Sequence, residues 1–420
     1  MIDVVVIGGG PGGSTSAGLL AKRGRSVLLL EQVHHPRFHL GESLLPGSMG
    51  TLESLGVLDD VRARFQVKRG AQFYDDLTGK YARFDFADAF NPVFPYAFQV
   101  PRDEFDALLL RRAATLGADV REGWTVTRVR FDGTRAVGVD VKDPTGSTHA
   151  IDARFVIDAS GRDAMTARSQ GATKRIPKLE NTALFSQWTG CWRDEGAQAG
   201  DILILLCAAG WFWFIPFNDG RTSVGAVVSN AWMKTRRPGE SVDELYKRAL
   251  LETAVTRRFV GGGAQLWPAG ATADFSFRVG ALAGDGWLTV GDAGGFIDPL
   301  FSTGAHLAIT GASLAAPAID DALRDGNVSA ARFAPFTGAI RGGSELFIGA
   351  VQSFYDGELT KYLFAERPRP FLKKSITSML AGDVFTPEAR WSSDLRTRFA
   401  PKLPDDQLDD RARSEHDRSI

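Results

Sequence analysis

The sequence has few cysteines and no excess of charge of either sign. Its 420 residues include two cysteines, Cys191 and Cys207, which allow at most one disulfide and no cysteine-rich metal site. The 49 lysines and arginines and the 50 acidic residues leave a net charge of −1, so there is no electrostatic case for nucleic acid or an acidic membrane as a partner. We therefore expect reduced core cysteines, no bound metal and a cytoplasmic location.

Long apolar runs are also missing. The longest, residues 202–217, contains Gly210 and Pro216 and is too short to cross a membrane as a helix. Two buried strands around a turn account for it better. The first residues lack the basic segment of a signal peptide. Because the chain is longer than one compact core usually is, we expect two intimately joined domains.

The most informative stretch is the first 31 residues. A β-branched run at residues 4–7 predicts a buried parallel strand, and Gly8, Gly10 and Gly13 follow it as G-x-G-x-x-G. A helix of small residues and a second apolar strand come next, and that strand ends in Glu31. The glycines let the backbone approach a pyrophosphate at a helix N-terminus, and the acid accepts a ribose hydroxyl. The pattern predicts a dinucleotide site, and its N-terminal position favours FAD.

Two later strands also end in glycine turns with an acidic residue. The strand at 155–157 leads into Asp158 and Gly161, and the strand at 287–290 leads into Gly291 and Asp292. Parallel strands bring such turns to one edge of a sheet, so both turns are expected to face the cofactor.

The segment 176–270 changes to alternating strands, which predicts a separate, mostly antiparallel sheet. The expected fold is mixed α/β: a Rossmann-like FAD-binding domain with an inserted antiparallel-sheet substrate domain and a helical C-terminal segment. The predicted limits are 1–70, 96–175 and 271–340 for the FAD-binding domain, 71–95 and 176–270 for the substrate-side sheet, 341–400 for the helices and 401–420 for a charged, disordered tail.

Four segments together resemble the flavin-dependent halogenases, a branch of the FAD-dependent monooxygenase superfamily that shares the fold of the aromatic hydroxylases. They are Trp211-x-Trp213-x-Ile215-Pro216, Phe296-x-x-Pro299-x-x-Ser302-x-Gly304, Gly41-Glu42-Ser43 and Lys68 in Lys-Arg-Gly-Ala. The first two are similar to signatures that separate halogenases from their relatives, and the lysine falls where the family keeps its functional lysine. Glu42, Ser43 and Arg102 join the expected FAD-binding residues.

The resemblance implies a specific use of these residues. Reduced FAD, dioxygen and chloride or bromide would give hypohalous acid, with the halide held at the backbone of Thr303 and Gly304. The acid would then reach Lys68, which hydrogen-bonds it or becomes a haloamine, and Ser302 is the second expected catalytic residue. A wall of bulky side chains would keep the substrate away from the flavin: Trp211, Trp213, Ile215, Pro216 and Phe301.

One departure from the family pattern narrows the range of expected substrates. Tryptophan halogenases carry a glutamate just before the Ser-Thr-Gly segment, whereas this chain has Phe301. The resemblance is therefore to halogenases of phenols and pyrroles, and it leaves open whether the ring is free or tethered to a carrier protein. A separate flavin reductase is expected, because the sequence has no second dinucleotide fingerprint. An aromatic hydroxylase of the same fold and a non-catalytic flavoprotein stay as alternatives, although the intact motifs favour a halogenase.

Overall fold

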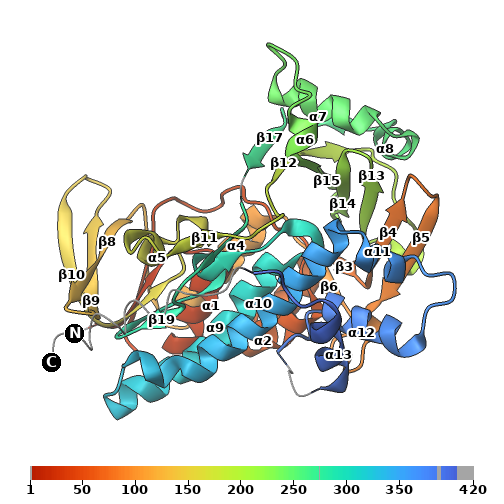
Figure 1. Ribbon diagram of the computed structural model, residues 1–420. Helices are drawn as coiled ribbons and strands as arrows, with labels where there is room; N and C mark the ends of the chain where they lie inside the picture. Colours follow the sequence, from red (N-terminus) through yellow and green to blue (C-terminus); the bar gives the residue numbers. More distant parts are fainter. Residues whose placement is uncertain (1, 274, 386–388, 404–420) are drawn as a thin grey trace, which may run out of the picture.

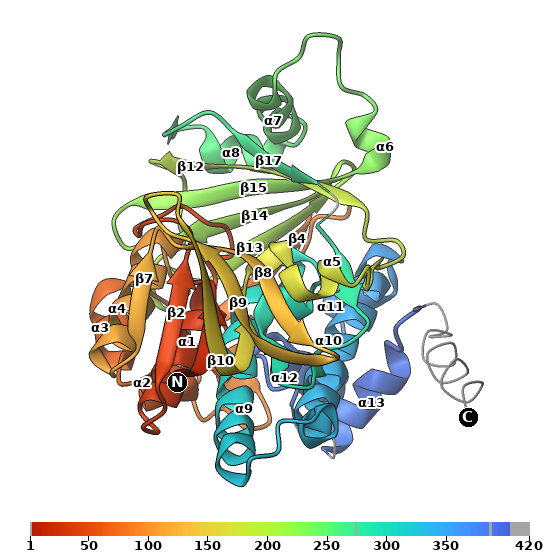
Figure 2. The same cartoon turned by 90° about the vertical axis from the view of Figure 1, so that its left-hand side faces the viewer.

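The computed structural model describes residues 2–273, 275–385 and 389–403. Two large sheets form its centre, and helices cover their outer faces (Figures 1 and 2). The mixed α/β fold expected from the sequence is confirmed. The limits of the two domains stay a prediction, and most of the predicted tail, 404–420, lies outside the described residues.

The first sheet contains the glycine-rich N-terminus. Its strand order is β19-β20-β10-β1-β2-β7, and its central strands are parallel. Val4, Val5 and Val6 are fully buried, as expected for a strand covered on both faces. An antiparallel ribbon of β8 and β9 continues from β10. The strand bounds are β1 Ile2–Ile7, β2 Val27–Glu31, β7 Asp119–Glu122, β8 Thr125–Asp132, β9 Arg135–Lys142, β10 Thr148–Asp158, β19 Ala283–Gly284 and β20 Trp287–Thr289.

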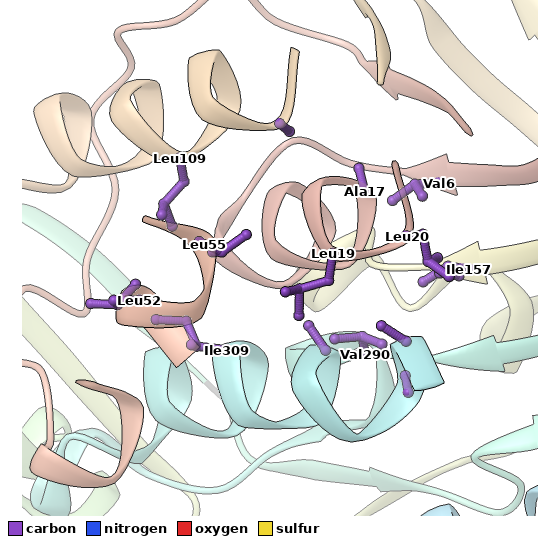
Figure 3. Packing of buried hydrophobic residues seen from close by; sticks show 14 of the residues in the cluster. Val6, Ala17, Leu19, Leu20, Leu52, Leu55, Leu109, Ile157, Val290 and Ile309 are labelled. Atoms are coloured by element: carbon purple, nitrogen blue, oxygen red, sulfur yellow. The ribbon is translucent and has the colours of Figure 1, made fainter. Parts of the chain in front are cut away.

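Helix α1 (Pro11–Ala21) packs against the first sheet and is enclosed by α4 (Arg102–Thr115) and α9 (Thr303–Asp325). Figure 3 shows Leu19 and Leu20 of α1 in one apolar cluster with Val290 and Ile309. Because neighbours surround α1, its small residues are required: a Cβ at Gly12 would lie 3.0 Å from Val290. This close packing fixes the N-terminus of α1 against the ends of the strands.

The second sheet has the order β16-β12-β15-β14-β13-β4-β5, with β17 also paired to β12. It is antiparallel except for the parallel pair β13 and β4, which agrees with the mostly antiparallel sheet expected from the sequence. Its bounds are β4 Gly70–Asp75, β5 Lys80–Asp85, β12 Asn181–Thr189, β13 Ile202–Cys207, β14 Gly210–Pro216, β15 Arg221–Ser229, β16 Ala264–Gln265 and β17 Gly270–Ala273.

Helices cover both faces of the second sheet. One face packs against α7 (Val242–Leu251), with α6 (Asn230–Met233) and α8 (Ala254–Val260) beside it, at the top of Figures 1 and 2. The other face packs on the C-terminal helices α10 (Ala334–Tyr355), α11 (Glu358–Leu363), α12 (Pro370–Leu380) and α13 (Arg390–Arg398). Within the described ranges, no helix has the length and apolar character needed to span a membrane.

Smaller elements connect these layers. Strand β3 (Gln66–Lys68) pairs with β6 (Ala97–Gln99). A three-stranded sheet contains β11 (Thr173–Arg175), β18 (Phe277–Val279) and β21 (Gly295–Phe296). Helix α5 is Met165–Ser169, and the single-turn 3₁₀ helices are η1 Pro46–Ser48, η2 Phe86–Asp88, η3 Gly161–Asp163, η4 Gly196–Gln198, η5 Gly291–Gly294, η6 Pro299–Phe301 and η7 Ala330–Phe333.

Two elements expected to be continuous are divided at glycines. Leucine and valine at helical spacing over 50–65 predict one helix. The structure has two, α2 (Met49–Leu55) and α3 (Leu58–Arg64), because Gly56 has a left-handed φ of 73°. The sequence also predicts one strand over 120–129, which is divided at Gly123, whose φ is 77°. Its first part, β7, extends the parallel sheet beside β2 instead of joining the antiparallel ribbon.

Candidate active site

A cavity of about 520 Å³ lies between the two sheets. Its lining comes from the carboxyl ends of β1 and β2, from the turns after β10 and β20, and from β12, β13 and β14 of the second sheet. Its size is in the range of small-molecule and cofactor sites. The glycine turns predicted from the sequence therefore meet the Trp-rich strand at one cavity.

The three glycines of the first turn have different surroundings. Gly8 has a φ of 97°, and a Cβ there would lie 2.5 Å from the Ala159 carbonyl oxygen. A Cβ at Gly13 would lie 1.9 Å from the carbonyl oxygen of Gly8. At Gly10 the nearest group to an added Cβ is the Arg37 guanidinium, at 3.7 Å. The outer glycines thus allow close packing of strand and helix, and Gly10 leaves space at the cavity for a ligand.

Glu31 lies at the carboxyl end of β2, borders the cavity and is buried. One carboxylate oxygen accepts a hydrogen bond from the Gly9 amide at 2.6 Å, and the other accepts one from the Val33 amide at 3.0 Å. This side chain therefore fixes the glycine turn to the second strand. The remaining lone pairs of its oxygens stay available to a ribose hydroxyl.

The other two glycine turns reach the cavity through only some of their expected residues. Gly161, Gly291 and Asp292 line it. Asp158 does not; it accepts hydrogen bonds from the amides of Ser160 and Thr166 and shapes the turn. Burial raises the pKa of Asp292 to about 6 against the opposing effect of Arg102 and Arg162.

Arg102 and Glu42 fix the position of residues 37–43, a segment that lines the cavity. Arg102 forms a buried ion pair with Asp106 at 2.7 Å and donates to the Leu40 carbonyl at 2.6 Å. Glu42 accepts a hydrogen bond from the Gln187 side-chain amide at 3.0 Å, and burial raises its pKa to about 7. Both residues line the cavity, so both could contact a bound cofactor.

These groups fit FAD. The space at Gly10 and the start of α1 suits a pyrophosphate, since the first N–H groups of a helix have no partner within it. Glu31 stands where a ribose would lie, and Gly161 and Gly291 leave two further backbone surfaces free of side chains. The cavity continues beyond this cradle toward β14 and α9.

At that far end the turn before α9 meets the Trp-rich strand. Ser302, Thr303 and Gly304 border the cavity, as do Trp213 and Ile215. Ser302 has a left-handed φ of 57°, which is uncommon for a residue other than glycine, and α9 begins directly after it. The free N–H groups and positive dipole end of α9 therefore point at the cavity and suit a halide.

Lys68 lies behind the cavity wall instead of on it. Its side chain is 1% exposed, and its amine donates to the Ser43 hydroxyl at 2.9 Å and to the Leu44 carbonyl at 3.1 Å. The Phe86 ring lies 5.2 Å from the amine. Burial lowers the pKa of Lys68 to about 7, although the Asp201 carboxylate opposes this effect. Since Ser43 lines the cavity, its hydroxyl forms a hydrogen-bonded connection between the Lys68 amine and the cavity.

Three residues expected in the wall lie one layer behind the cavity. The Trp211 indole donates to the Tyr355 hydroxyl at 2.9 Å, which donates to the Asp298 carboxylate at 3.0 Å. Phe301 packs against Phe354, with ring centroids 6.4 Å apart. Pro216 ends β14 in the core. The surface toward the cavity is thus formed by Trp213 and Ile215.

Sequence reasoning did not single out several residues of the site. Arg37 borders the cavity near Gly10, but it stands in a histidine-rich loop without a helix or strand pattern. Gln187 is one of several alternating residues of β12, and nothing in the sequence distinguishes it from its neighbours. Asp298 and Tyr355 are far apart in the sequence, and only the fold brings them into contact. Asp298 is the one with a local signal, since it lies within the pattern that ends in Ser-Thr-Gly.

The fold and the cradle define an FAD-binding flavoprotein, and residues 1–329 match the FAD binding domain family. Relatives specify the branch. The chain is 38% identical over 320 residues to a tryptophan 2-halogenase from Chondromyces crocatus, covering 75% of this chain and 60% of that protein. It is 30% identical over 411 residues to a 1H-pyrrole-2-carbonyl-[peptidyl-carrier protein] chlorinase from Pseudomonas fluorescens, covering 91% and 90%. The chain belongs to the flavin-dependent halogenases.

Solved structures agree with this assignment. The flavin-dependent brominase Bmp2 superposes with a TM-score of 0.84 at 26% identity and covers 100% of both chains. A flavoprotein/dehydrogenase from Cytophaga hutchinsonii gives a TM-score of 0.87 at 32% identity, covering 95% of this chain and 96% of the other. Within the described residues, the halogenase fold thus includes the C-terminal helices.

Proposed function

We propose that this halogenase chlorinates or brominates an electron-rich ring, a phenol or a pyrrole, that is carried by a carrier protein. One observation carries the mechanism: the buried Lys68 amine reaches the cavity through the Ser43 hydroxyl, away from the glycine turns. The near full-length similarity to a pyrrole-carrier-protein chlorinase supports the substrate class. A cytoplasmic location is part of the same proposal.

FAD, reduced and exposed to dioxygen, supplies the oxidant that converts the halide to hypohalous acid. The chain's own residues hold the reactants. Gly10 and the α1 N-terminus receive the pyrophosphate, and Glu31 receives a ribose hydroxyl. Thr303 and Gly304, at the start of α9, hold the halide through backbone N–H groups.

Lys68 then directs the halogen to the substrate. As an ammonium group it donates a hydrogen bond to hypohalous acid and makes the halogen more electrophilic. As a neutral amine it attacks the halogen, so that an N–halogen bond forms while hydroxide leaves and takes the amine proton as water. The lowered pKa makes both forms available near neutral pH. On the first route the ring attacks the halogen of hypohalous acid, the O–halogen bond breaks, and the departing hydroxide takes the ring proton as water. On the second route the ring attacks the halogen of the haloamine, the N–halogen bond breaks, and the nitrogen regains a proton as the ring loses one.

Trp213 and Ile215 line the cavity and would form the wall between the flavin and the substrate ring. A ring on the Lys68 side of this wall cannot approach the flavin, so direct hydroxylation is suppressed. Ser302 positions the turn from which α9 begins, and its hydroxyl borders the same space. Trp211, Pro216 and Phe301 support the wall from behind.

The substrate class follows from Phe301 and from the relatives. The phenyl ring at this position offers no carboxylate to stabilise positive charge on an attacked indole. The tryptophan 2-halogenase is the more identical of the two relatives, but this chain covers only 60% of it. Full-length agreement with the chlorinase favours a pyrrolyl or phenolic ring on a carrier. A separate flavin reductase completes the proposed system.

Mass spectrometry of products tests the proposal. Purified protein would receive reduced FAD and a panel of free and carrier-bound pyrroles and phenols, with chloride or bromide. We expect a halogenated ring with the isotope pattern of the halide supplied. Hydroxylated product that forms equally without halide would instead establish the aromatic hydroxylase alternative.

A further inference from the structure

Helix α12 and its flanks form a cationic surface, which we call the α12 patch: the exposed Arg367, Arg369, Lys374 and Arg390, and the half-buried Lys373. The protein as a whole has a net charge of −1, so this local excess does not follow from composition. Glu366 is an exposed acidic neighbour. Among the residues that the structure describes, no carboxylate forms an ion pair with any of the five cations.

The α12 patch surrounds exposed apolar groups. Phe371 is 41% exposed, and its ring lies 5.4 Å from the Phe90 ring, centroid to centroid. Lys374 lies 4.9 Å above the Phe90 ring, and Arg390 lies 5.6 Å above the Phe371 ring. An apolar centre with a charged rim is the usual composition of a protein-binding surface.

Residues 86–90 contact both helix α12 and the side chain of Lys68. Helix α12 packs on η2 and β5, and the Phe90 amide donates to the Ser378 hydroxyl of α12 at 2.8 Å. On the inner side of the same segment, Phe86 lies 5.2 Å from the Lys68 amine. The chain between the patch and the amine is therefore one short segment thick.

We propose that the α12 patch docks an acidic carrier protein, whose thioester arm enters beside segment 86–95 and delivers its ring to Lys68. This inference rests on the proposed function and adds the surface that recognises the partner. Charge complementarity argues for the occupant, because unpaired cations attract an acidic partner and increase its association rate. Docking here places the ring on the side of Lys68 that is opposite the flavin cradle.

A charge-reversal variant tests the α12 patch: Arg369→Glu with Lys373→Glu and Lys374→Glu. The matched control reverses three exposed cations on the other face of the second sheet, Lys234, Arg237 and Arg258. Each protein would be assayed with a pyrrole-2-carbonyl thioester on an acidic carrier protein and with the same thioester on free pantetheine. Flavin content and circular dichroism would verify folding.

We expect the patch variant alone to raise KM for the carrier-bound thioester by about tenfold or more, with little change in kcat. Turnover of the pantetheine thioester should not change, and salt should weaken carrier recognition only in proteins with an intact patch. Equal KM values for the patch variant and the control would overturn the docking site and leave the halogenase function standing. A wild-type protein that halogenates the pantetheine thioester as efficiently as the carrier form would do the same.

Two further outcomes would overturn the proposal in different ways. If binding to anionic phospholipid vesicles is lost in the patch variant while the carrier KM is unchanged, the α12 patch is a membrane contact. If the wild-type protein halogenates neither thioester nor any free ring, the proposed function fails together with the docking site.

Discussion

The amine of Lys68 and the hydroxyl of Ser43 lie 2.9 Å apart. Because Ser43 lines the proposed FAD cavity, this hydrogen bond connects the buried amine to that cavity. The lysine belongs to strand β3, and the serine belongs to the cavity-lining segment 37–43. The second acceptor of the amine is the Leu44 carbonyl, and Leu44 does not line that cavity.

Substitution of Lys68 should abolish halogenation without loss of flavin. We expect Lys68→Ala and Lys68→Arg each to lower product halogenation at least about 100-fold, because arginine retains charge but does not become a neutral nucleophile. Both variants should bind FAD and oxidise it after reduction. Flavin reoxidation and product halogen content would be measured on the same samples. Loss of halogenation with normal reoxidation means that halogen transfer has failed, whereas loss of both means that the protein is not folded. Lys80→Ala, an exposed lysine on β5, is the control; near wild-type halogenation by Lys68→Ala would contradict the mechanism.

The buried amine should also produce a pH-dependent stability. The pKa of Lys68 falls from 10.5 to about 7 on folding, so the unfolded chain binds more protons between these values. Stability contributed by this residue therefore rises with pH from about 7 to about 10, by up to ~1.4 kcal/mol per pH unit. Lys68→Met should lose this slope. Melting temperatures of the two proteins across that range test it, and parallel curves would mean that the amine is not desolvated.

Gly10→Val should give folded protein without flavin. An added side chain finds space in the protein itself, with the nearest atom 3.7 Å away, but it occupies the proposed pyrophosphate position. Flavin absorbance per protein should fall to near zero, while circular dichroism stays that of the wild type. Gly338→Ala, whose added Cβ meets no neighbour within 4 Å, should retain its flavin. A full flavin complement in Gly10→Val would relocate the cofactor site.

Bound flavin should be reduced slowly by NADH or NADPH alone. The sequence carries one dinucleotide fingerprint, and its residues line the proposed FAD cradle. Stopped-flow absorbance should show rapid reduction only after a separate flavin reductase is added. Fast reduction by a nicotinamide alone would support the hydroxylase alternative.

Free tryptophan should be a poor substrate because Phe301 stands where tryptophan halogenases carry a glutamate. We expect trace or non-selective chlorination under conditions that convert a pyrrolyl thioester completely. Efficient chlorination at one ring position, observed by mass spectrometry and NMR, would assign the chain to the tryptophan-specific branch.

Local patterns predicted the cofactor cradle, and only the fold revealed the rest. The G-x-G-x-x-G turn and Glu31 are encoded within one strand-helix-strand unit, so spacing alone places them. Trp211, Trp213 and Ile215 share one face of β14 because side chains alternate along a strand, but the position at which the cavity ends depends on the packing of other elements. For that reason Trp211 was expected on the wall and lies behind it.

The contact between Lys68 and Ser43 could not be predicted from the sequence for a similar reason. It depends on how β3 pairs with β6 and how residues 43–44 lie against that pair, which no local propensity specifies. The breaks at Gly56 and Gly123 were missed because apolar spacing continued across both glycines. A left-handed turn at one residue outweighed the periodic pattern on its two sides.

The hydrogen-bonded series Trp211–Tyr355–Asp298 restricts how halogenases of this type can be recombined. Tyr355 ends α10, so a chimaera that receives a foreign C-terminal segment also receives a foreign residue at this position. Without a hydroxyl there, the indole of β14 and the carboxylate beside the α9 turn would both be buried without this partner, at about 1–3 kcal/mol each. Exchange of C-terminal segments to change substrate range should therefore use a crossover after residue 355.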